Sequence, residues 1–413
     1  LWTEASAMKV FIIHAHTANR GDEAAIKAMV DELLLAEPDI ELTISINGRT
    51  FYPSMDPRVN QIGRFPTLHS ITAKLEYPIF LKTGGRIRFT ESGKNFYRSL
   101  DLADLIIHAP GGPSIGDIYA DAEKQYLDRL SLVKRMGKKY MFYAPSMGPF
   151  NDKSKESIRK DILVGAEKVI LRDPISYKYV EDFCPECHPV LALDSAFQHD
   201  VDAEANESKL KSYTALDCFL LRHENNIGIT ITDLKWHPKH GKTRVSERIK
   251  AEFHKFVGYL DKRGYGVVFI PQLYGTGDDS TLMKEFRTDT NGFVIDANNN
   301  DYDTYFQQYV IGKLTAIVGM RYHSNIFSAK MGVPFVSISY EQKMVGFMES
   351  AGLTDYCIDI EDLSVEKLIN KFELMITNYA QYRVQLEEKH NEWKQKAYVS
   401  TQAALNILRK GQN

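Results

Sequence analysis

Apolar runs and segments of helical periodicity alternate along the chain. Residues 9–15 (KVFIIHA) form a continuous apolar run typical of a buried strand, and residues 24–37 carry a helical pattern. Further strands are predicted at 105–109, 139–144 and 169–171, with a helix over 122–136 that Gly137 ends. Because alternating strands and helices form parallel sheets covered on both faces, this half predicts a doubly wound α/β domain.

A second α/β pattern follows residues 200–225, which are polar and are predicted to be irregular. It gives strands at 227–232, 266–270, 315–320, 334–339 and 356–360, a helix over 245–263, and mostly helix from 365 to 409. We therefore predict two Rossmann-like domains, 8–205 and 206–380, and a helical segment, 381–413, that packs back on the first domain. Ligands of such folds bind at the carboxyl ends of the strands, so we expect the active site in a cleft that both domains face.

Composition narrows the class of protein. The chain has 413 residues, of which 44% are hydrophobic, and a net charge of −3, so no overall basic field indicates nucleic-acid binding. It has no apolar run of transmembrane length, only four cysteines and no pattern of an export signal, so we expect a cytoplasmic protein. Cys184, Cys187 and His188 match a C-x-x-C-H haem or half-zinc pattern, but no second C-x-x-C completes a zinc site; we expect no metal and no cofactor.

The main candidate site begins where the strand at 315–320 ends. Arg321 and His323 stand at the start of a helix that Ser324 is expected to cap. A helix N-terminus attracts anions, arginine adds a bidentate fork for carboxylate or phosphate, and histidine exchanges protons near neutral pH. The next strand end supplies Tyr340 and Lys343, and Lys343 would hold a second anionic group unless it is simply solvated.

Other strand ends supply weaker candidates. Asn19, Gly21 and Asp22 lead into the first helix, where Asp22 either caps the helix or binds a sugar hydroxyl. The pair Gly111-Gly112 and Gln272 each follow a predicted strand, as does Arg172-Asp173, for which an ion pair within the domain is the competing interpretation. We assign Asn19, Gly21, Asp22, Gly111, Gly112 and Gln272 to the acceptor or cleft side.

Together these segments resemble the polysaccharide pyruvyl transferase family. The matching motifs lie at 19–24, 111–112, 144–150, 171–176, 194–197, 319–323 and 338–347, in the family's order. Pro113 departs from the pattern, since the family usually has a third glycine there, and proline offers no N–H for a phosphate. The resemblance implies a glycosyltransferase-B-like fold, phosphoenolpyruvate as donor and a pyruvate ketal on a surface or capsular polysaccharide precursor as product.

The resemblance also implies that Arg321 and His323, with Arg172 as a further candidate, belong to the donor site. We assign Tyr340, Lys343 and Ser324 to the same site, and expect His323 to protonate the methylene carbon as general acid. Asp22 and Asp173 are candidates for the base. A glycosyltransferase of the same fold with a nucleotide-sugar donor, and a non-catalytic sugar- or anion-binding protein, remain alternatives.

The composition of segment 64–98 suggests where the protein meets its acceptor. It holds seven basic residues against two acidic ones, a net charge of +5, with six aromatic residues interleaved. Basic residues favour anionic lipid and aromatic residues favour the membrane interface. We expect either a helix pair packed on the first domain or a peripheral contact with the inner membrane face, beside an acceptor that is lipid-linked.

Overall fold

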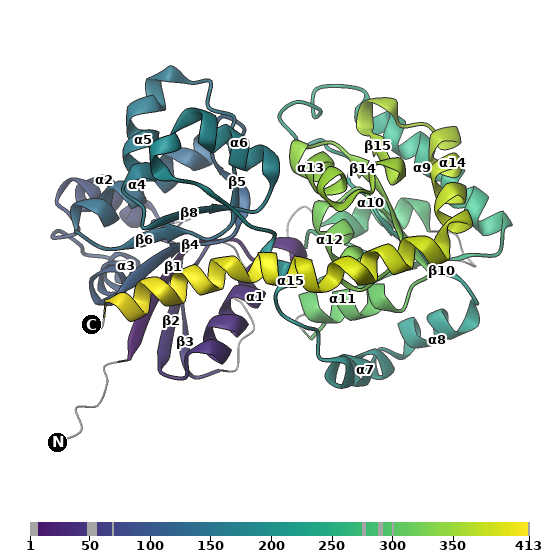
Figure 1. Ribbon diagram of the computed structural model, residues 1–413, viewed down its shortest axis with the longest axis horizontal. Coiled ribbons are helices and arrows are strands. Elements are labelled where there is room, and N and C mark those ends of the chain that lie inside the picture. The colour runs from purple at the N-terminus through teal and green to yellow at the C-terminus, as the bar shows by residue number, and fades with distance from the viewer. Residues whose placement is uncertain are drawn as a thin grey trace. The chain divides into compact units, whose positions relative to one another are not determined.

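The computed structural model describes residues 7–47, 56–67, 70–274, 278–287, 292–299 and 301–411. The chain divides into two compact units (Figure 1). Unit 1 comprises residues 1–17, 25–199 and 395–413, and unit 2 comprises 18–24 and 200–394. This division differs from the expected domains at 8–205, 206–380 and 381–413 chiefly in residues 18–24, which belong to unit 2 although they precede most of unit 1.

Within its described residues, unit 1 has a seven-stranded parallel sheet of order β3-β2-β1-β4-β6-β8-β9. The strands are β1 Met8–Ala15, β2 Ile40–Ile46, β3 Val59–Gly63, β4 Leu105–His108, β6 Tyr140–Phe142, β8 Lys168–Leu171 and β9 Val190–Leu191. A separate parallel pair joins β5 Gly111–Ile115 to β7 Pro145–Met147. The helices are α1 Arg20–Ala36, α2 Ile71–Lys82, α3 Glu91–Leu102, α4 Ala120–Arg135, α5 Glu156–Val164 and α6 Pro174–Phe183.

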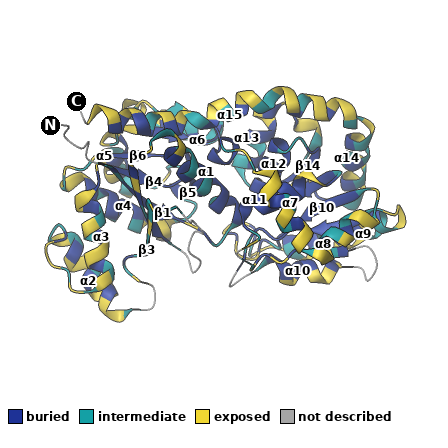
Figure 2. Ribbon diagram, turned by 90° about the horizontal axis from the view of Figure 1, so that it is seen from below, coloured by how far each residue is buried: buried dark blue, intermediate teal, exposed yellow. Residues whose placement is uncertain are grey.

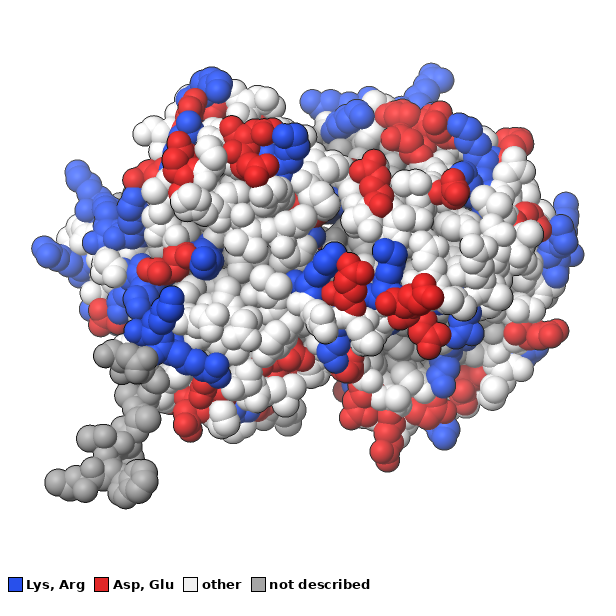
Figure 3. All heavy atoms as spheres, in the orientation of Figure 1, with Lys and Arg blue, Asp and Glu red and all other residues white. Residues whose placement is uncertain are grey.

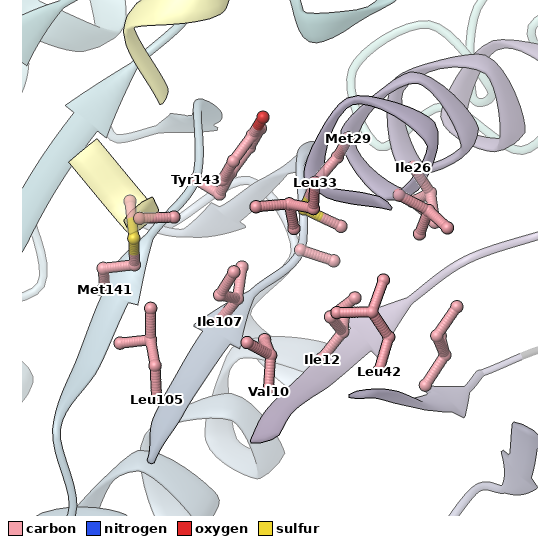
Figure 4. Packing of buried hydrophobic residues seen from close by; sticks show 14 of the residues in the cluster. Val10, Ile12, Ile26, Met29, Leu33, Leu42, Leu105, Ile107, Met141 and Tyr143 are labelled. Atoms are coloured by element: carbon pink, nitrogen blue, oxygen red, sulfur yellow. The ribbon is translucent and has the colours of Figure 1, made fainter. Parts of the chain in front are cut away.

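Apolar cores lie on both faces of this sheet. On one face, Val10, Ile12 and Ile107 of the strands pack against Met29 and Leu33 of α1 (Figure 4). On the other face, alternate residues of the same strands meet the apolar sides of α3 to α6. Burial on both faces explains why these strands are continuous apolar runs in the sequence instead of alternating patterns.

Unit 2 repeats the design with, in the part described, a six-stranded parallel sheet of order β12-β11-β10-β13-β14-β15. The strands are β10 Asn226–Thr230, β11 Gly266–Phe269, β12 Gly292–Val294, β13 Ala316–Gly319, β14 Phe335–Ser339 and β15 Cys357–Asp359. The helices are α7 Ala203–Ser212, α8 Thr214–Arg222, α9 Val245–Lys262, α10 Asp279–Phe286, α11 Thr304–Gly312, α12 Tyr322–Lys330, α13 Gln342–Ala351 and α14 Val365–Thr377. The four inner strands β10, β11, β13 and β14 are buried, as are almost all residues of α11 and α12, whereas α8 and α9 keep exposed outer faces (Figure 2).

The expectation of irregular structure at 200–225 is wrong, because α7 and α8 occupy most of this segment. Asp202 caps α7 by accepting a hydrogen bond from the backbone N–H of Ala205. Each helix buries only two residues, among them Leu210 and Leu216. So narrow a buried stripe gives little hydrophobic periodicity, which is why the pattern concealed these helices.

The last helix, α15 (Tyr379–Lys410), belongs to both units. Its first part lies in unit 2, where the ring of Trp393 is 6.0 Å from that of Phe347. Its last part lies in unit 1, where Leu405 and Leu408 enter the core that also contains β1 and α1. The helical C-terminal segment therefore returns the chain to unit 1.

Candidate functional site

Arg321 lies between β13 and α12, and His323 lies in the first turn of α12, at the carboxyl edge of the sheet of unit 2. Arg321 is the N-cap residue of α12, and no side chain caps this helix. Ser324 does not cap it, contrary to our expectation. Its hydroxyl instead donates to the carbonyl of Arg321 (2.6 Å) and shares a hydrogen bond with Thr230 of β10 (2.7 Å). Ser324 is fully buried and joins α12 to the neighbouring strand, so it supports the site from inside the fold.

The guanidinium of Arg321 is held on several sides. It forms an ion pair with Asp279 of α10, a hydrogen bond with Tyr340, and lies 5.6 Å from the ring centroid of Trp236. Burial opposes its charge, but Asp279 and Tyr340 outweigh this effect and raise the pKa of Arg321. Its Nε is buried without a hydrogen-bond partner among the described residues. Arg321 is thus a cation held in a fixed position, and its Nε can still donate a hydrogen bond to a ligand.

The end of β14 supplies a second cation beside the first. Tyr340 follows the strand and Glu341 is the N-cap residue of α13, which no side chain caps. Lys343 contacts Glu341 at 2.7 Å, and its Nζ lies 5.6 Å from the ring centroid of Tyr322. Burial would raise the pKa of Glu341, but Lys343 and His237 lower it to about 2, so this carboxylate stays ionised. Since β13 and β14 are neighbours, two uncapped helix N-termini begin at the same edge.

The segment 18–24 docks on this part of unit 2. The N–H of Arg20 donates to the carbonyl of Gln272 (2.8 Å), and that of Tyr274 donates to the carbonyl of Ala18 (3.2 Å). The capping role considered for Asp22 belongs to Asn19, whose side chain accepts a hydrogen bond from the N–H of Gly21 (2.8 Å). Asp22 is the third residue of α1, where a carboxylate favours the helix dipole.

Gly21 is the residue of segment 18–24 that packs against His323, the candidate general acid. A β-carbon built at Gly21 would lie 2.0 Å from Nδ1 of His323. Gln272 is also buried here, and its Nε2 donates to Gln307 of α11 (2.6 Å). Four residues expected on the acceptor or cleft side therefore belong to the same unit as the expected donor residues Arg321, His323, Ser324, Tyr340 and Lys343; they are Asn19, Gly21, Asp22 and Gln272.

Arg172 belongs to unit 1. Its Nη1 donates to Asp194 (2.8 Å) and its Nε to Ser146 (2.9 Å), so the competing interpretation of an ion pair within the domain holds. Asp173, our other candidate base, caps α6 by accepting from the N–H of Ser176 (2.8 Å). Its other oxygen accepts hydrogen bonds from the hydroxyls of Ser146 and Ser176. Both side chains therefore stabilise unit 1.

Gly111 and Gly112 open β5, just beyond the end of β4. Both have φ values that favour glycine, 134° and 114°. A β-carbon at Gly112 would lie 2.8 Å from the backbone nitrogen of Ser114 and 2.9 Å from the carbonyl oxygen of Ser146. Close packing of the β5–β7 pair thus explains Gly112 without a ligand.

A polar cluster that the sequence analysis missed lies at the carboxyl ends of β1 and β4. The rings of His14 and His108 are 4.6 Å apart, and the ring of Tyr126 lies 4.4 Å from His14. Burial lowers the pKa of His108 to about 4, and burial followed by the charge of His108 lowers the pKa of His14. Arg129 is buried beside them. The signal that could have found the cluster is a histidine at the end of each of two predicted strands.

The two cysteines of the C-x-x-C-H segment are held in the thiol form. Cys184 and Cys187 are free thiols. Burial raises the pKa of Cys184, and burial together with Cys184 raises the pKa of Cys187 to about 12. Both shifts favour the protonated thiol, and the expectation that this segment binds no metal stays a prediction. No helix in the described part of the chain combines the length and apolar character needed to cross a bilayer.

Comparison with solved structures defines the class of fold as glycosyltransferase-B-like. Similar structures include UDP-GlcNAc 2-epimerase from Neisseria meningitidis bound to UDP-GlcNAc (12% identity, TM-score 0.60, covering 97% of this chain and 100% of that one). S. aureus MnaA with UDP (11%, 0.60, 97% and 97%) and Anabaena Alr3699/HepE with UDP and glucose (10%, 0.58, 97% and 99%) are also similar. At these identities the likeness shows the fold alone, and it confirms the predicted pair of Rossmann-like domains.

The family follows from the sequence. The profile of the polysaccharide pyruvyl transferase family matches residues 19–342, so the chain belongs to this family. The amylovoran biosynthesis protein AmsJ of Erwinia amylovora is 24% identical in an alignment that covers 92% of this chain and 94% of AmsJ. The predicted resemblance is confirmed, and the protein is a transferase of polysaccharide biosynthesis.

Proposed function

We propose that the protein transfers the enolpyruvyl group of phosphoenolpyruvate to a sugar of a surface or capsular polysaccharide precursor, forming a pyruvate ketal and releasing phosphate. The observation that carries this proposal is the site of unit 2. There, Arg321 and Lys343 stand at two uncapped helix N-termini that follow neighbouring strands, and His323 lies beside Arg321. No cofactor or metal takes part in the proposed reaction.

The two anionic groups of phosphoenolpyruvate match these two positions. A helix N-terminus carries a partial positive charge and presents N–H groups. Arg321 and Lys343 already have Asp279 and Glu341 as partners, so their charges are largely balanced before the donor arrives. The helix N-termini and the remaining Nε of Arg321 therefore supply the attraction, while the ion pairs fix the two cations in place.

His323 acts as the general acid. It gives a proton to the methylene carbon of the donor, which makes the neighbouring carbon electron-poor, and a sugar hydroxyl attacks that carbon. A second hydroxyl of the same sugar then closes the ketal, and the bond to the phosphate oxygen breaks. One hydroxyl proton returns the histidine to its acid form and the other leaves with a base. Asp22 is the remaining candidate for that base, since the carboxylate of Asp173 is occupied within unit 1.

Unit 1 is proposed to carry the acceptor side. The buried cluster of His14, His108 and Arg129 lies at the edge of its sheet where doubly wound folds bind ligands. Both ring nitrogens of His14 and Nε2 of His108 lack a hydrogen-bond partner among the described residues. Sugar hydroxyls both donate and accept hydrogen bonds, so they match neutral imidazoles. A cleft that both domains face remains a prediction.

Titration calorimetry with phosphoenolpyruvate and with UDP-sugars tests the donor. We expect binding of phosphoenolpyruvate and none of UDP-sugars; the reverse would favour a glycosyltransferase with a nucleotide-sugar donor. Release of phosphate that depends on a saccharide acceptor tests catalysis. Donor binding without any phosphate release across a panel of acceptors would favour a non-catalytic binding protein.

The acceptor is proposed to be lipid-linked and to be met at the inner face of the membrane. An acceptor in this position requires a cytoplasmic protein that contacts the membrane peripherally. The donor supports the cytoplasmic side, since phosphoenolpyruvate is a metabolite of that compartment. Fractionation of cells tests the location: the protein should divide between the soluble fraction and a membrane fraction from which high salt releases it.

A further inference from the structure

Helix α2 of unit 1 carries apolar residues on its exposed side as well as on its buried side. Ala73, Glu76 and Phe80 form its buried face. Ile71, Leu75 and Ile79, which follow one another at intervals of four residues, form a stripe on the other face and are 76%, 63% and 42% exposed. Single exposed apolar residues are ordinary, but a continuous stripe on a helix marks a surface that has a partner.

The loop after α2 extends the stripe. Ile87 and Phe89 are 51% and 52% exposed. The buried carboxylate of Glu76 accepts hydrogen bonds from the N–H groups of Phe89 (2.6 Å) and Thr90 (3.1 Å), which fasten the loop to the helix. A backbone held in this way keeps its exposed side chains in place without a covering partner. We call Ile71, Leu75, Ile79, Ile87 and Phe89 the apolar ridge.

Basic side chains accompany the ridge. Lys74, Lys82 and Arg86 are exposed, and their side chains form no hydrogen bond or ion pair with another described residue. Figure 3 shows Lys and Arg side chains gathered over α2 and α3. Of the two acidic residues of segment 64–98, Glu76 is buried and Glu91 pairs with Lys94 (2.8 Å). The surface around the ridge is therefore positively charged.

The structure changes which residues of this segment can meet a partner. Of the aromatic residues in the sequence pattern, Phe65, Phe80 and Phe96 are buried in the core of unit 1 and only Phe89 is exposed. Arg88 is also committed to the fold, because its guanidinium lies 3.9 Å from the ring centroid of Tyr97. The aliphatic residues of α2, which the sequence pattern passed over, form most of the exposed surface.

We propose that the apolar ridge inserts into the headgroup region of an anionic lipid bilayer, with Lys74, Lys82 and Arg86 contacting the lipid phosphates. The positive charge favours this occupant over a second copy of the chain, because two copies of the same basic surface would repel each other. Apolar side chains on one face of a helix with basic residues along it are typical of helices that lie in the membrane interface. This contact is independent of the proposed reaction and would hold without the donor.

Sedimentation with vesicles tests the proposal, using vesicles of phosphatidylcholine alone and with phosphatidylserine. The wild-type protein should bind the anionic vesicles and be released by salt. The triple variant Lys74→Gln, Lys82→Gln, Arg86→Gln should bind about 100-fold more weakly. A matched control, Arg222→Gln, Lys262→Gln, Lys284→Gln, makes the same change of charge at exposed positions of unit 2 and should bind like the wild type.

A second variant tests the ridge itself. Leu75→Ser, Ile79→Ser, Phe89→Ser should weaken binding at least about 10-fold, while Leu35→Ser, Leu221→Ser, which changes exposed leucines elsewhere, should not. Circular dichroism should show that all variants are folded. The proposal would be overturned if the triple variant of Lys74, Lys82 and Arg86 bound anionic vesicles as well as its charge control does. It would also be overturned if the wild-type protein were a dimer and the ridge variant a monomer. Turnover with a water-soluble acceptor should be unchanged in every variant, which separates this test from that of the reaction.

Discussion

Gly21 and His323 pack so closely that a β-carbon at residue 21 would lie 2.0 Å from Nδ1 and 2.6 Å from the β-carbon of the histidine. Both the ring and its attachment point would have to move to admit an alanine. The glycine of the family motif at 19–24 is thus matched to the histidine of the motif at 319–323. Its role is to leave room for the imidazole.

The first prediction follows from this contact. Gly21→Ala should lower turnover by about 10²–10⁴-fold, as loss of a general acid does, because the imidazole is displaced. Gly258→Ala in α9 is the matched control, since nothing lies within 4 Å of a β-carbon built there. It should keep full activity and raise the free energy of unfolding by up to about 1 kcal/mol through helix propensity. Steady-state kinetics and urea unfolding measure both. A fully active Gly21→Ala enzyme would contradict the assignment.

The second prediction concerns the role of His323. His323→Gln should lower turnover by about 10²–10⁴-fold while the donor still binds, because glutamine keeps hydrogen-bonding capacity but transfers no proton. Calorimetry measures donor binding and phosphate release measures turnover. If binding collapses while turnover per bound donor stays normal, His323 holds the donor instead of protonating it.

The third prediction separates donor binding by Arg321 from its structural ion pair. Arg321→Ala should weaken donor use by one to several orders of magnitude, equivalent to roughly 2–5 kcal/mol. It also leaves Asp279 without its cation, so stability should fall as well. The double variant Arg321→Ala, Asp279→Asn removes that charge and should recover stability but not donor use. Recovery of both in the double variant would show that Arg321 serves only the fold.

The fourth prediction is that Arg172 acts mainly on stability. The side chains of Arg172 and Asp194 are almost completely buried and form an ion pair at 2.8 Å. Arg172→Ala should therefore lower the free energy of unfolding by roughly 3–5 kcal/mol. Urea unfolding measures this change, and Lys178→Ala, which breaks an exposed pair, should change it little. A stable Arg172→Ala protein that no longer binds phosphoenolpyruvate would restore Arg172 to the donor site.

The fifth prediction concerns acid. Burial holds the pKa of His108 at about 4, below the value of about 6.5 expected in the unfolded chain. Between these values the unfolded chain binds the proton and the folded chain does not. The part of the stability that depends on His108 is therefore complete above pH 6.5 and falls by roughly 3 kcal/mol as the pH drops toward 4. His108→Asn, whose amide can replace the hydrogen bond to the carbonyl of Ala109, should make the slope shallower in urea unfolding between pH 7 and 4 and leave the part that buried His14 contributes.

The sequence by itself determined the alternation of strands and helices, since burial of parallel strands on both faces leaves apolar runs such as residues 9–15 that survive without any tertiary information. It also determined that Arg321, His323 and Lys343 stand where strands end and helices begin, because this depends only on neighbours in the chain. It missed α7 and α8, whose narrow buried stripes leave no periodic signal.

Only the tertiary structure decided which strand ends share a site. Residues 18–24 precede most of unit 1 yet join unit 2, because their backbone pairs with that of Gln272–Tyr274. Arg172 faces Asp194, and His14 meets His108, across separations of 22 and 94 residues that no local pattern encodes. The sequence likewise gave no sign that the apolar stripe of α2 is exposed. The sequence does not distinguish an apolar residue in a core from one on a surface, and only the packing of the fold decides which face of a helix is covered.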